Sequence, residues 1–118
     1  MTYSEIYTTE DIVRARAKNI GADPNPTDGM VIEYIGQAQE LIDSILGFSL
    51  LENFNETKHG IVKMVCTDIA AFYAIAYDPS GFTSISEAAF IADLIYTNML
   101  RGLTLLKDER IQKKLMEA

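Results

Sequence analysis

Apolar residues recur at helical spacing in four stretches of the chain, and no stretch alternates apolar and polar residues for long. The pattern is clearest in the second stretch, where Val31, Ile35, Ala38, Ile42 and Ile45 share one stripe and polar residues take the opposite side. Such a stripe is typical of a helix that packs on one face. The sequence therefore predicts an all-α fold, a small antiparallel bundle of about four helices.

Capping and turn residues set the limits of these predicted helices. A strong turn, Asp-Pro-Ser-Gly, follows the third helix, and a Ser-x-x-Glu capping box opens the fourth. We expect the helices to run from Thr8 to Gly21, from the Asn-Pro-Thr-Asp segment 25–28 to Gly47, from about Glu56 to Tyr77, and from Ser84 to about Leu106.

The third predicted helix is apolar on almost every side. Between Met64 and Tyr77 only Thr67 and Asp68 fall outside the apolar set. A helix of this kind must be enclosed by other protein, and a chain of 118 residues has little material to enclose it. We therefore expect sister subunits to supply the missing cover, which favours a self-assembling helical protein over a small monomeric enzyme.

Length and charge narrow the class of protein further. A chain of 118 residues fits one domain. Ten Lys and Arg face seventeen Asp and Glu, which gives a net charge of −7. Proteins that bind duplex DNA tightly do so through clustered cations, so this composition argues against tight DNA binding. A partly acidic face still suits DNA that slides past without sticking.

The chain offers little material for catalysis or metal binding. Cys66 and His59 are the only residues of their types, and no phosphate-binding loop or nucleophile motif is present. Glu33, Glu40 and Asp43 lack the spacing of a calcium loop, so we interpret them as a solvated helix face. We expect His59 to be solvated near a helix start. We predict no enzyme activity, no catalytic residue, no cofactor and no metal site.

Asp68 stands out because an unpaired buried carboxylate is very costly. One interpretation is an ion pair or registry device at a subunit interface; the other is a local hydrogen bond or a partly wet edge of the domain. On the same helix Cys66, Ala70 and Ala74 form a strip of small residues. Core packing and a close helix contact between subunits explain this strip equally well.

On the fourth predicted helix, Phe90 and Leu94 lie off the main apolar stripe, on the side that carries Asn98 and Arg101. They either dock a neighbouring subunit or contact the apolar loop around Phe54. The candidate interface residues are Phe90, Leu94, Asp68 and Arg101.

After residue 106 the pattern changes to a charged segment, so we divide the chain into a helical bundle domain, 1–106, and a C-terminal tail, 107–118. The tail is predicted to be helical, either continuing the fourth helix or separate from it. Its basic residues suit an acidic protein partner better than DNA, although a solvated end fits equally well. The candidate docking residues are Lys107, Arg110, Ile111, Lys113, Lys114, Leu115 and Met116.

Targeting signals and membrane spans are not expected. The N-terminus lacks the basic start and apolar core of a secretory signal. Charged residues interrupt both of the most apolar stretches, Lys63 and Asp68 in one and Asp93 and Arg101 in the other. We therefore expect a protein made in the cytoplasm that does not enter the membrane.

The order of these features resembles the head-to-tail connector family of tailed phages, also called adaptor or head-completion proteins. The resemblance lies in a short Y-T-T-E-D-I opening helix, a P-x-D turn and a V-I-E-Y-I-G-Q-A-Q-E-L-I-D-S-I-L-G helix. An apolar helix with I-A-A-F-Y-A and a last helix with a charged tail follow. These motifs of apolar and small residues cover most of the chain.

The resemblance implies a virion protein of the neck: a ring, usually of twelve subunits, that joins the portal of the capsid to the stopper or tail-completion protein and extends the DNA channel. Double-stranded DNA would pass through the ring without sequence-specific binding. The tail, 107–118, would dock on the portal, with Ile111, Leu115 and Met116 as anchors. The family has no catalytic motif to transfer. The alternative is a small cytosolic helical module that binds or regulates a partner protein.

Overall fold

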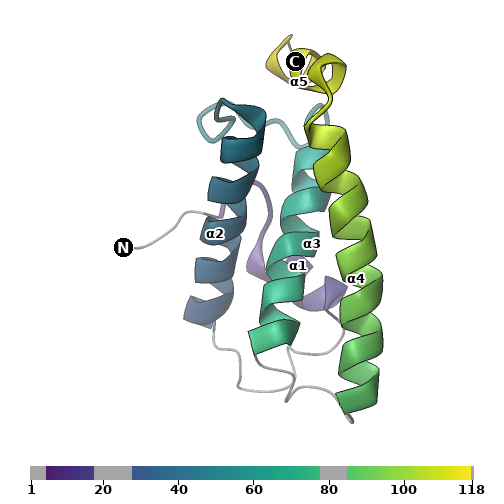
Figure 1. The fold of residues 1–118 in the computed structure, drawn as a ribbon. Helices are drawn as coiled ribbons and strands as arrows, with labels where there is room; N and C mark the ends of the chain where they lie inside the picture. The colour runs from purple at the N-terminus through teal and green to yellow at the C-terminus, as the bar shows by residue number, and fades with distance from the viewer. Residues whose placement is uncertain (1–4, 18–27, 78–84, 118) are drawn as a thin grey trace.

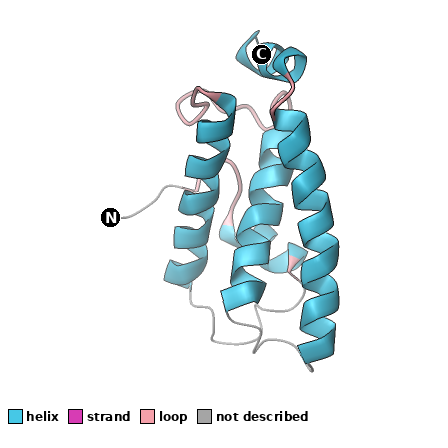
Figure 2. Ribbon diagram, in the orientation of Figure 1, coloured by secondary structure: helices cyan, strands magenta, loops and turns pink. Residues whose placement is uncertain are grey.

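A computed structural model describes residues 5–17, 28–77 and 85–117 (Figure 1). Figure 2 shows these residues as helices joined by loops, with no strand among them, so the predicted all-α class is confirmed. The helices of the described residues are α1 (Glu10–Arg16), α2 (Asp28–Leu46), α3 (Gly60–Tyr77), α4 (Ile85–Leu106) and α5 (Glu109–Glu117).

The first helix begins one residue later than the Thr8 cap predicts. Its N-cap is Thr9, which makes no side-chain capping bond, while the Thr8 hydroxyl is turned inward to Thr67. Glu10 and Asp11 lie in the first turn, where carboxylates interact favourably with the helix dipole. The described part of this helix ends at Arg16. The rest of the predicted helix, up to Gly21, lies outside the described residues.

Gly47 ends α2 as predicted, because it adopts a φ of 80°, a left-handed conformation that glycine takes without steric cost. The predicted start of this helix before residue 28 and the Ser84 cap of α4 both lie outside the described residues.

The third helix begins at Gly60, so the prediction of a start near Glu56 is wrong. The side-chain oxygen of Asn55 accepts the backbone N–H groups of Thr57 and Lys58 at 2.9 and 3.1 Å. Asn side chains stabilise turns in this way and compete with helix formation. Residues 56–58 therefore form a turn that leads into α3.

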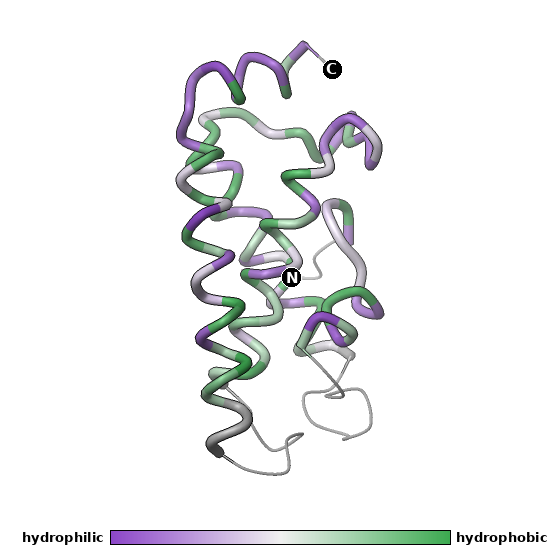
Figure 3. The backbone as a smooth tube through the Cα atoms, turned by 90° about the vertical axis from the view of Figure 1, so that its right-hand side faces the viewer, coloured by the Kyte–Doolittle hydropathy of each residue, from purple (hydrophilic) through white to green (hydrophobic). Residues whose placement is uncertain are grey.

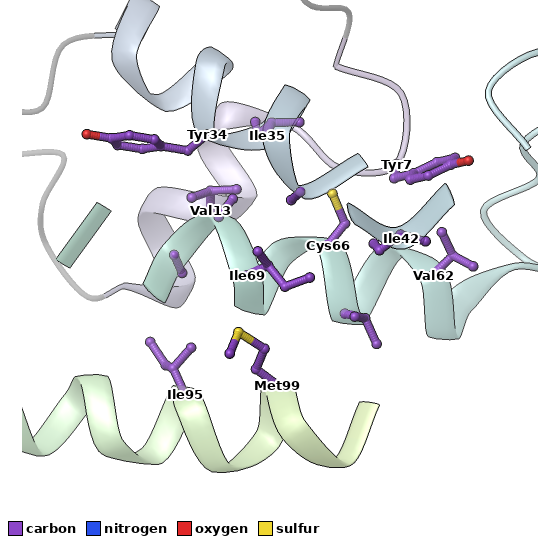
Figure 4. Packing of buried hydrophobic residues seen from close by; sticks show 14 of the residues in the cluster. Tyr7, Val13, Tyr34, Ile35, Ile42, Val62, Cys66, Ile69, Ile95 and Met99 are labelled. Atoms are coloured by element: carbon purple, nitrogen blue, oxygen red, sulfur yellow. The ribbon is translucent and has the colours of Figure 1, made fainter. Parts of the chain in front are cut away.

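The core is built around α3, which packs against α1, α2 and α4 (Figure 1). Figure 4 shows Ile95 and Met99 of α4 pointing toward the side of α3 that carries Ile69. The buried side chains of α3 are covered by this one chain, so the premise that a single chain has too little material to enclose this helix is wrong, whereas a contact with sister subunits stays a prediction. The buried residues of the helix are Val62, Val65, Cys66, Thr67, Asp68, Ile69, Ala70, Ala71, Ala74 and Ile75.

Small residues let the helices approach closely. Cys66, Ala70 and Ala74 are fully buried within the chain, so the small-residue strip belongs to the core. Gly102 of α4 faces Val65 of α3, and a Cβ atom at Gly102 would overlap the Val65 side chain. The α3–α4 contact therefore depends on the missing side chain at Gly102.

The segment before α1 is fastened to α2 by buried hydrogen bonds. The side-chain oxygen of Gln39 accepts the backbone N–H groups of Ile6 and Tyr7 at 2.8 and 3.0 Å. The Tyr7 hydroxyl donates to Asp43 at 2.6 Å and accepts the N–H of Leu50 at 2.9 Å. Tyr7 thus joins the N-terminal segment, α2 and the loop after α2, a role that the sequence pattern did not reveal.

The charged tail forms a separate helix, α5, one of the two forms that the sequence allowed. The chain turns at Lys107 and Asp108, and the Asp108 carboxylate accepts the N–H of Arg110 at 2.8 Å. In Figure 1, α5 lies across the end of the molecule where α4 finishes. Leu115 is buried there, so the tail packs back on the helical core.

Candidate interaction site

A hollow of about 400 Å³ opens beside the contact of α3 with α4. A second hollow of about 260 Å³ adjoins it and shares Arg16, Met64 and Asp68. We call the two together the lateral hollow. Its lining residues come from α1, α3 and α4: Ile12, Arg16, Gly60, Lys63, Met64, Thr67, Asp68, Asn98, Arg101, Gly102 and Leu105.

An ion pair between α1 and α3 lies in the wall of the lateral hollow. The Arg16 Nε atom lies 2.7 Å from Asp68 Oδ1. The Asp68 side chain is 5% exposed and that of Arg16 38%. Burial raises the pKa of the Asp68 carboxyl, and the hydrogen bond and charge of Arg16 only partly oppose this effect. Of the two interpretations of Asp68, the structure shows a local bond within the chain, and a role between subunits stays a prediction.

Next to this pair, a buried bond between two hydroxyl groups fastens the N-terminal segment to α3. Thr8 Oγ1 and Thr67 Oγ1 are 2.7 Å apart. Thr67 donates its proton to the Lys63 carbonyl at 2.8 Å, so Thr8 is the donor between the two threonines. The wall of the lateral hollow is therefore held by three polar contacts with partners in the same chain.

Met64 lies where the two parts of the lateral hollow meet, and its side chain is 55% exposed. Among the described positions of α3, Met64 is the large apolar side chain that stays exposed. Five of the ten exposed large apolar side chains among the described residues lie instead on α4. Apolar surface is therefore exposed mainly on α4 rather than on α3, where the sequence placed it, and its contact with other molecules stays a prediction.

Phe90 and Leu94 are 63% and 49% exposed. The alternative, contact with the loop around Phe54, is wrong. Phe54 packs against Tyr7 and His59, with ring centroids 5.2 and 5.7 Å apart. This loop lies at the end of the molecule opposite the start of α4 (Figure 1).

Arg101 lines the same hollow as Asp68, but its guanidinium makes no ion pair or hydrogen bond with any described residue. The structure therefore brings Asp68 and Arg101 to one site, and it places Phe90 and Leu94 on the flank of α4 that leads into this site. The role of these residues between subunits stays a prediction.

The candidate docking residues, Lys107 before α5 and the others within it, are divided between exposed and buried positions. Lys107, Arg110, Lys113 and Lys114 are exposed. Among the apolar candidates, Met116 is 62% exposed, Ile111 is half-buried and Leu115 is buried against the chain's own core. In this conformation Met116 is the predicted anchor that a partner reaches directly.

His59 is fully buried, so the prediction of a solvated histidine is wrong. Its Nδ1 atom accepts the backbone N–H of Asn55 at 2.9 Å. The proton is therefore on Nε2, which donates to the Leu115 carbonyl at 3.1 Å. Because Leu115 is 56 residues away in sequence, no local pattern signalled this contact.

The buried nucleophilic groups are held in their protonated forms. Burial raises the pKa of the Cys66 thiol, and burial together with Asp43 raises the pKa of the Tyr7 hydroxyl. Thiol reactivity requires the thiolate, so Cys66 is inert at neutral pH. Among the described residues, no three His, Cys, Asp or Glu side chains lie together as metal ligands would.

The fold and these surfaces define a small all-helical protein with a lateral hollow and an apolar flank on α4. By length and composition alone, residues Ala89–Leu106 of α4 are apolar enough to cross a membrane, with 28% of this window buried in the protein. A comparison of the chain with protein families, with curated proteins and with solved structures found no match.

Proposed function

We propose that this chain is a structural virion protein of a tailed phage, an adaptor that forms a ring between the portal of the capsid and the tail or stopper. In this proposal α1 to α4 act as a small antiparallel bundle, and α5 acts as the tail that docks on the portal. The ring, of twelve subunits by family resemblance, extends the DNA channel in the neck of the virion.

The observation that carries the proposal is the exposed apolar surface of α4 beside the lateral hollow. Phe90, Leu94 and Leu105 are each more than two-fifths exposed, and Leu105 lines the lateral hollow together with Met64. Exposed apolar surface of this kind marks a protein contact. A closed ring repeats one such contact many times, so a modest patch suffices for a stable assembly.

Charge supports the same assignment. The chain carries a net charge of −7, and a negative surface repels the DNA backbone. A conduit needs this property because the DNA must slide through without being held. Catalysis, a cofactor and sequence-specific DNA binding have no part in this function.

The docking role of the tail rests on the exposed residues of α5. Its three basic side chains, that of Lys107 just before it, and Met116 are exposed. Such a surface suits an acidic partner with an apolar contact at its centre. If Leu115 also serves as an anchor, α5 must first release the buried side chain of Leu115 and the bond from His59.

The experiment is to mix the purified chain with the portal protein encoded in the same genome and to image the mixture by electron microscopy. We expect a ring of added density on the portal. A triple variant of exposed residues, Lys113→Glu, Lys114→Glu and Met116→Ser, should lose this density while it stays folded by circular dichroism. A portal that stays bare with the full chain in excess, together with virions whose necks lack this protein, contradicts the proposal.

The alternative, a small helical interaction module, has one observation in its favour. The lateral hollow is lined by apolar side chains such as Met64 and Leu105 and by the guanidinium of Arg101, which pairs with none of the residues that the structure describes. A groove of this kind suits an amphipathic partner helix that carries a carboxylate. A monomeric chain that binds a bacterial regulatory protein and ignores the portal would favour this alternative. A monomer alone does not decide, because isolated adaptors can stay monomeric before assembly.

A further inference from the structure

The outward side of α4 carries a second pattern besides its core stripe. Phe90, Leu94, Thr97, Arg101 and Thr104 are all exposed and follow one another at intervals of four, three, four and three residues. This heptad spacing is typical of the seam along which two helices pack. We call these residues, with Asp93 and Leu100 beside them, the α4 seam. These residues are exposed, and no described helix covers the seam. Figure 3 shows that α4 as a whole carries both hydrophilic (purple) and hydrophobic (green) residues along its length.

Both threonines of the seam turn their hydroxyl groups into their own helix. Thr97 donates to the carbonyl of Asp93 at 3.0 Å, and Thr104 donates to that of Leu100 at 2.9 Å. With each hydroxyl proton bonded in this way, the methyl groups are left as the surface that a partner would meet. The seam is therefore more apolar than its sequence suggests.

The charges of the seam are placed symmetrically. Asp93 lies four residues before Thr97 and Arg101 four residues after it. They are the only charged residues between Ala89 and Leu106, and neither side chain has a partner among the described residues. The seam is thus neutral, although the whole chain has a net charge of −7.

We propose that the α4 seam pairs antiparallel with the α4 seam of a second copy, about a two-fold axis at Thr97. This arrangement brings Asp93 to the height of Arg101 of the partner subunit, twice over, and Leu94 to the height of Leu100 of the partner subunit. A parallel pair would set Asp93 against Asp93 and Arg101 against Arg101, which is repulsive. The charge pattern therefore selects the antiparallel arrangement.

A second copy fits the seam better than a lipid bilayer does. A bilayer would have to accept the charges of Asp93 and Arg101 inside the apolar window, where each charged side chain is costly. A second copy supplies each of them with an opposite charge. One helix on each side covers less than the roughly 800 Å² per partner of a standard interface, so we expect a weak dimer that dissociates in the micromolar range.

The pair does not rest on the proposed function. It uses Phe90, Leu94 and Arg101, which the proposed ring also uses, so one subunit cannot make both contacts at once. The pair is then the form of the free chain, and it separates when the chain assembles elsewhere. A chain that pairs but never binds a portal would refute the ring alone, and the reverse result would refute the pair alone.

The main test is a charge exchange, read by sedimentation over a concentration range of about 1 µM to 1 mM. Arg101→Asp places two carboxylates at each of the two charged contacts, and we expect the dissociation constant to rise roughly tenfold or more. Asp93→Arg should act in the same way through two guanidinium groups. The double variant Asp93→Arg with Arg101→Asp should restore the dimer, because the new arginine of each subunit then faces the new aspartate of the other.

Glu33→Lys, an exposed charge reversal on α2, serves as the matched control and should leave the dimer unchanged. A cross-link supplies a second reading. Thr97→Cys lies on the proposed axis and should form a disulfide-linked dimer on oxidation, whereas Glu33→Cys should not. Cys66 does not interfere because it is fully buried.

Three results would overturn the pair: a chain that stays monomeric over the whole range, a dimer that the double exchange fails to restore, or flotation of the chain with neutral phosphatidylcholine vesicles. Circular dichroism of each variant shows whether a loss of dimer comes from the interface or from unfolding. The seam is exposed, so these substitutions should leave the fold intact.

Discussion

At the scale of single residues, three polar contacts join distant parts of the chain. They are Arg16 with Asp68, Thr8 with Thr67, and His59 with Leu115. Each joins segments far apart in sequence, and each has at least one partner that is buried. Buried polar groups stay favourable only while they are paired. Removing one partner therefore costs more than the net contribution of the bond itself.

Arg16→Ala should destabilise the protein by about 1 to 3 kcal/mol at neutral pH, because it leaves the Asp68 carboxylate buried without its cation. The partial exposure of Arg16 keeps this figure below that of a fully buried pair. Urea unfolding of the variant and of the natural chain measures the difference.

The cost of Arg16→Ala should depend on pH. Burial already raises the pKa of Asp68, and removing Arg16 raises it further. The folded variant then holds the proton to a higher pH than the unfolded chain does, so its stability falls as pH rises through this range. The difference from the natural chain should be small below the ordinary Asp pKa of about 3.9 and largest at neutral pH. A difference that stays constant from acid to neutral pH would contradict this account.

His59→Phe keeps an aromatic ring beside Phe54 but removes both hydrogen bonds of the imidazole. The N–H of Asn55 and the carbonyl of Leu115 lose their partner, at a cost of about 1 to 3 kcal/mol. We also expect faster proteolysis within α5, since its fastening to the core is weakened. Lys113→Ala, an exposed change on the same helix, is the control and should alter neither reading.

At the scale of the helices, α4 approaches α3 closely at Gly102. Gly102 sits where α4 meets Val65, and the lack of a side chain there lets the two helices touch. Glycine within a helix costs about 1 kcal/mol relative to alanine. The tight contact offsets that cost because it buries α3 on a side that the other helices do not cover.

Gly102→Ala should therefore destabilise the protein although it improves helix propensity. The added methyl group overlaps the rigid side chain of Val65, and overpacking costs about 1 to 3 kcal/mol. The double variant Gly102→Ala with Val65→Ala should be more stable than the sum of the single variants predicts. A thermal unfolding cycle of the four proteins measures this coupling, and strict additivity would show that the overlap is relieved elsewhere.

At the scale of the whole molecule, the protein closes its core around α3 and leaves α4 incompletely covered. Ile91, Ile95 and Leu106 face the core, whereas Phe90 and Leu94 face solvent. A surface of this kind contributes little to the stability of one chain. Its contribution is expected in contacts with other molecules, whether the proposed ring or the proposed pair.

The double variant Phe90→Ser with Leu94→Ser should separate these two contributions. We expect the free energy of unfolding to change by less than about 0.5 kcal/mol, as for most exposed positions. Self-association and binding to the portal should both weaken. Urea unfolding and sedimentation measure the two effects, and a large loss of stability would place both side chains in the core instead.

The sequence by itself determined the helical class, the end of α2 at Gly47 and the apolar flank of α4. These features follow from local periodicity and from the conformational preference of single residues, which any short window contains. The sequence misplaced the start of α3 because the Asn55 side chain, rather than helix propensity, decides residues 56–58.

Only the tertiary structure decided how those elements are used. It showed that one chain encloses α3, that Asp68 is paired with Arg16, and that His59 is buried against Leu115. The paired residues are 52 and 56 positions apart. No local pattern encodes such contacts, because they depend on the packing of helices from distant parts of the chain.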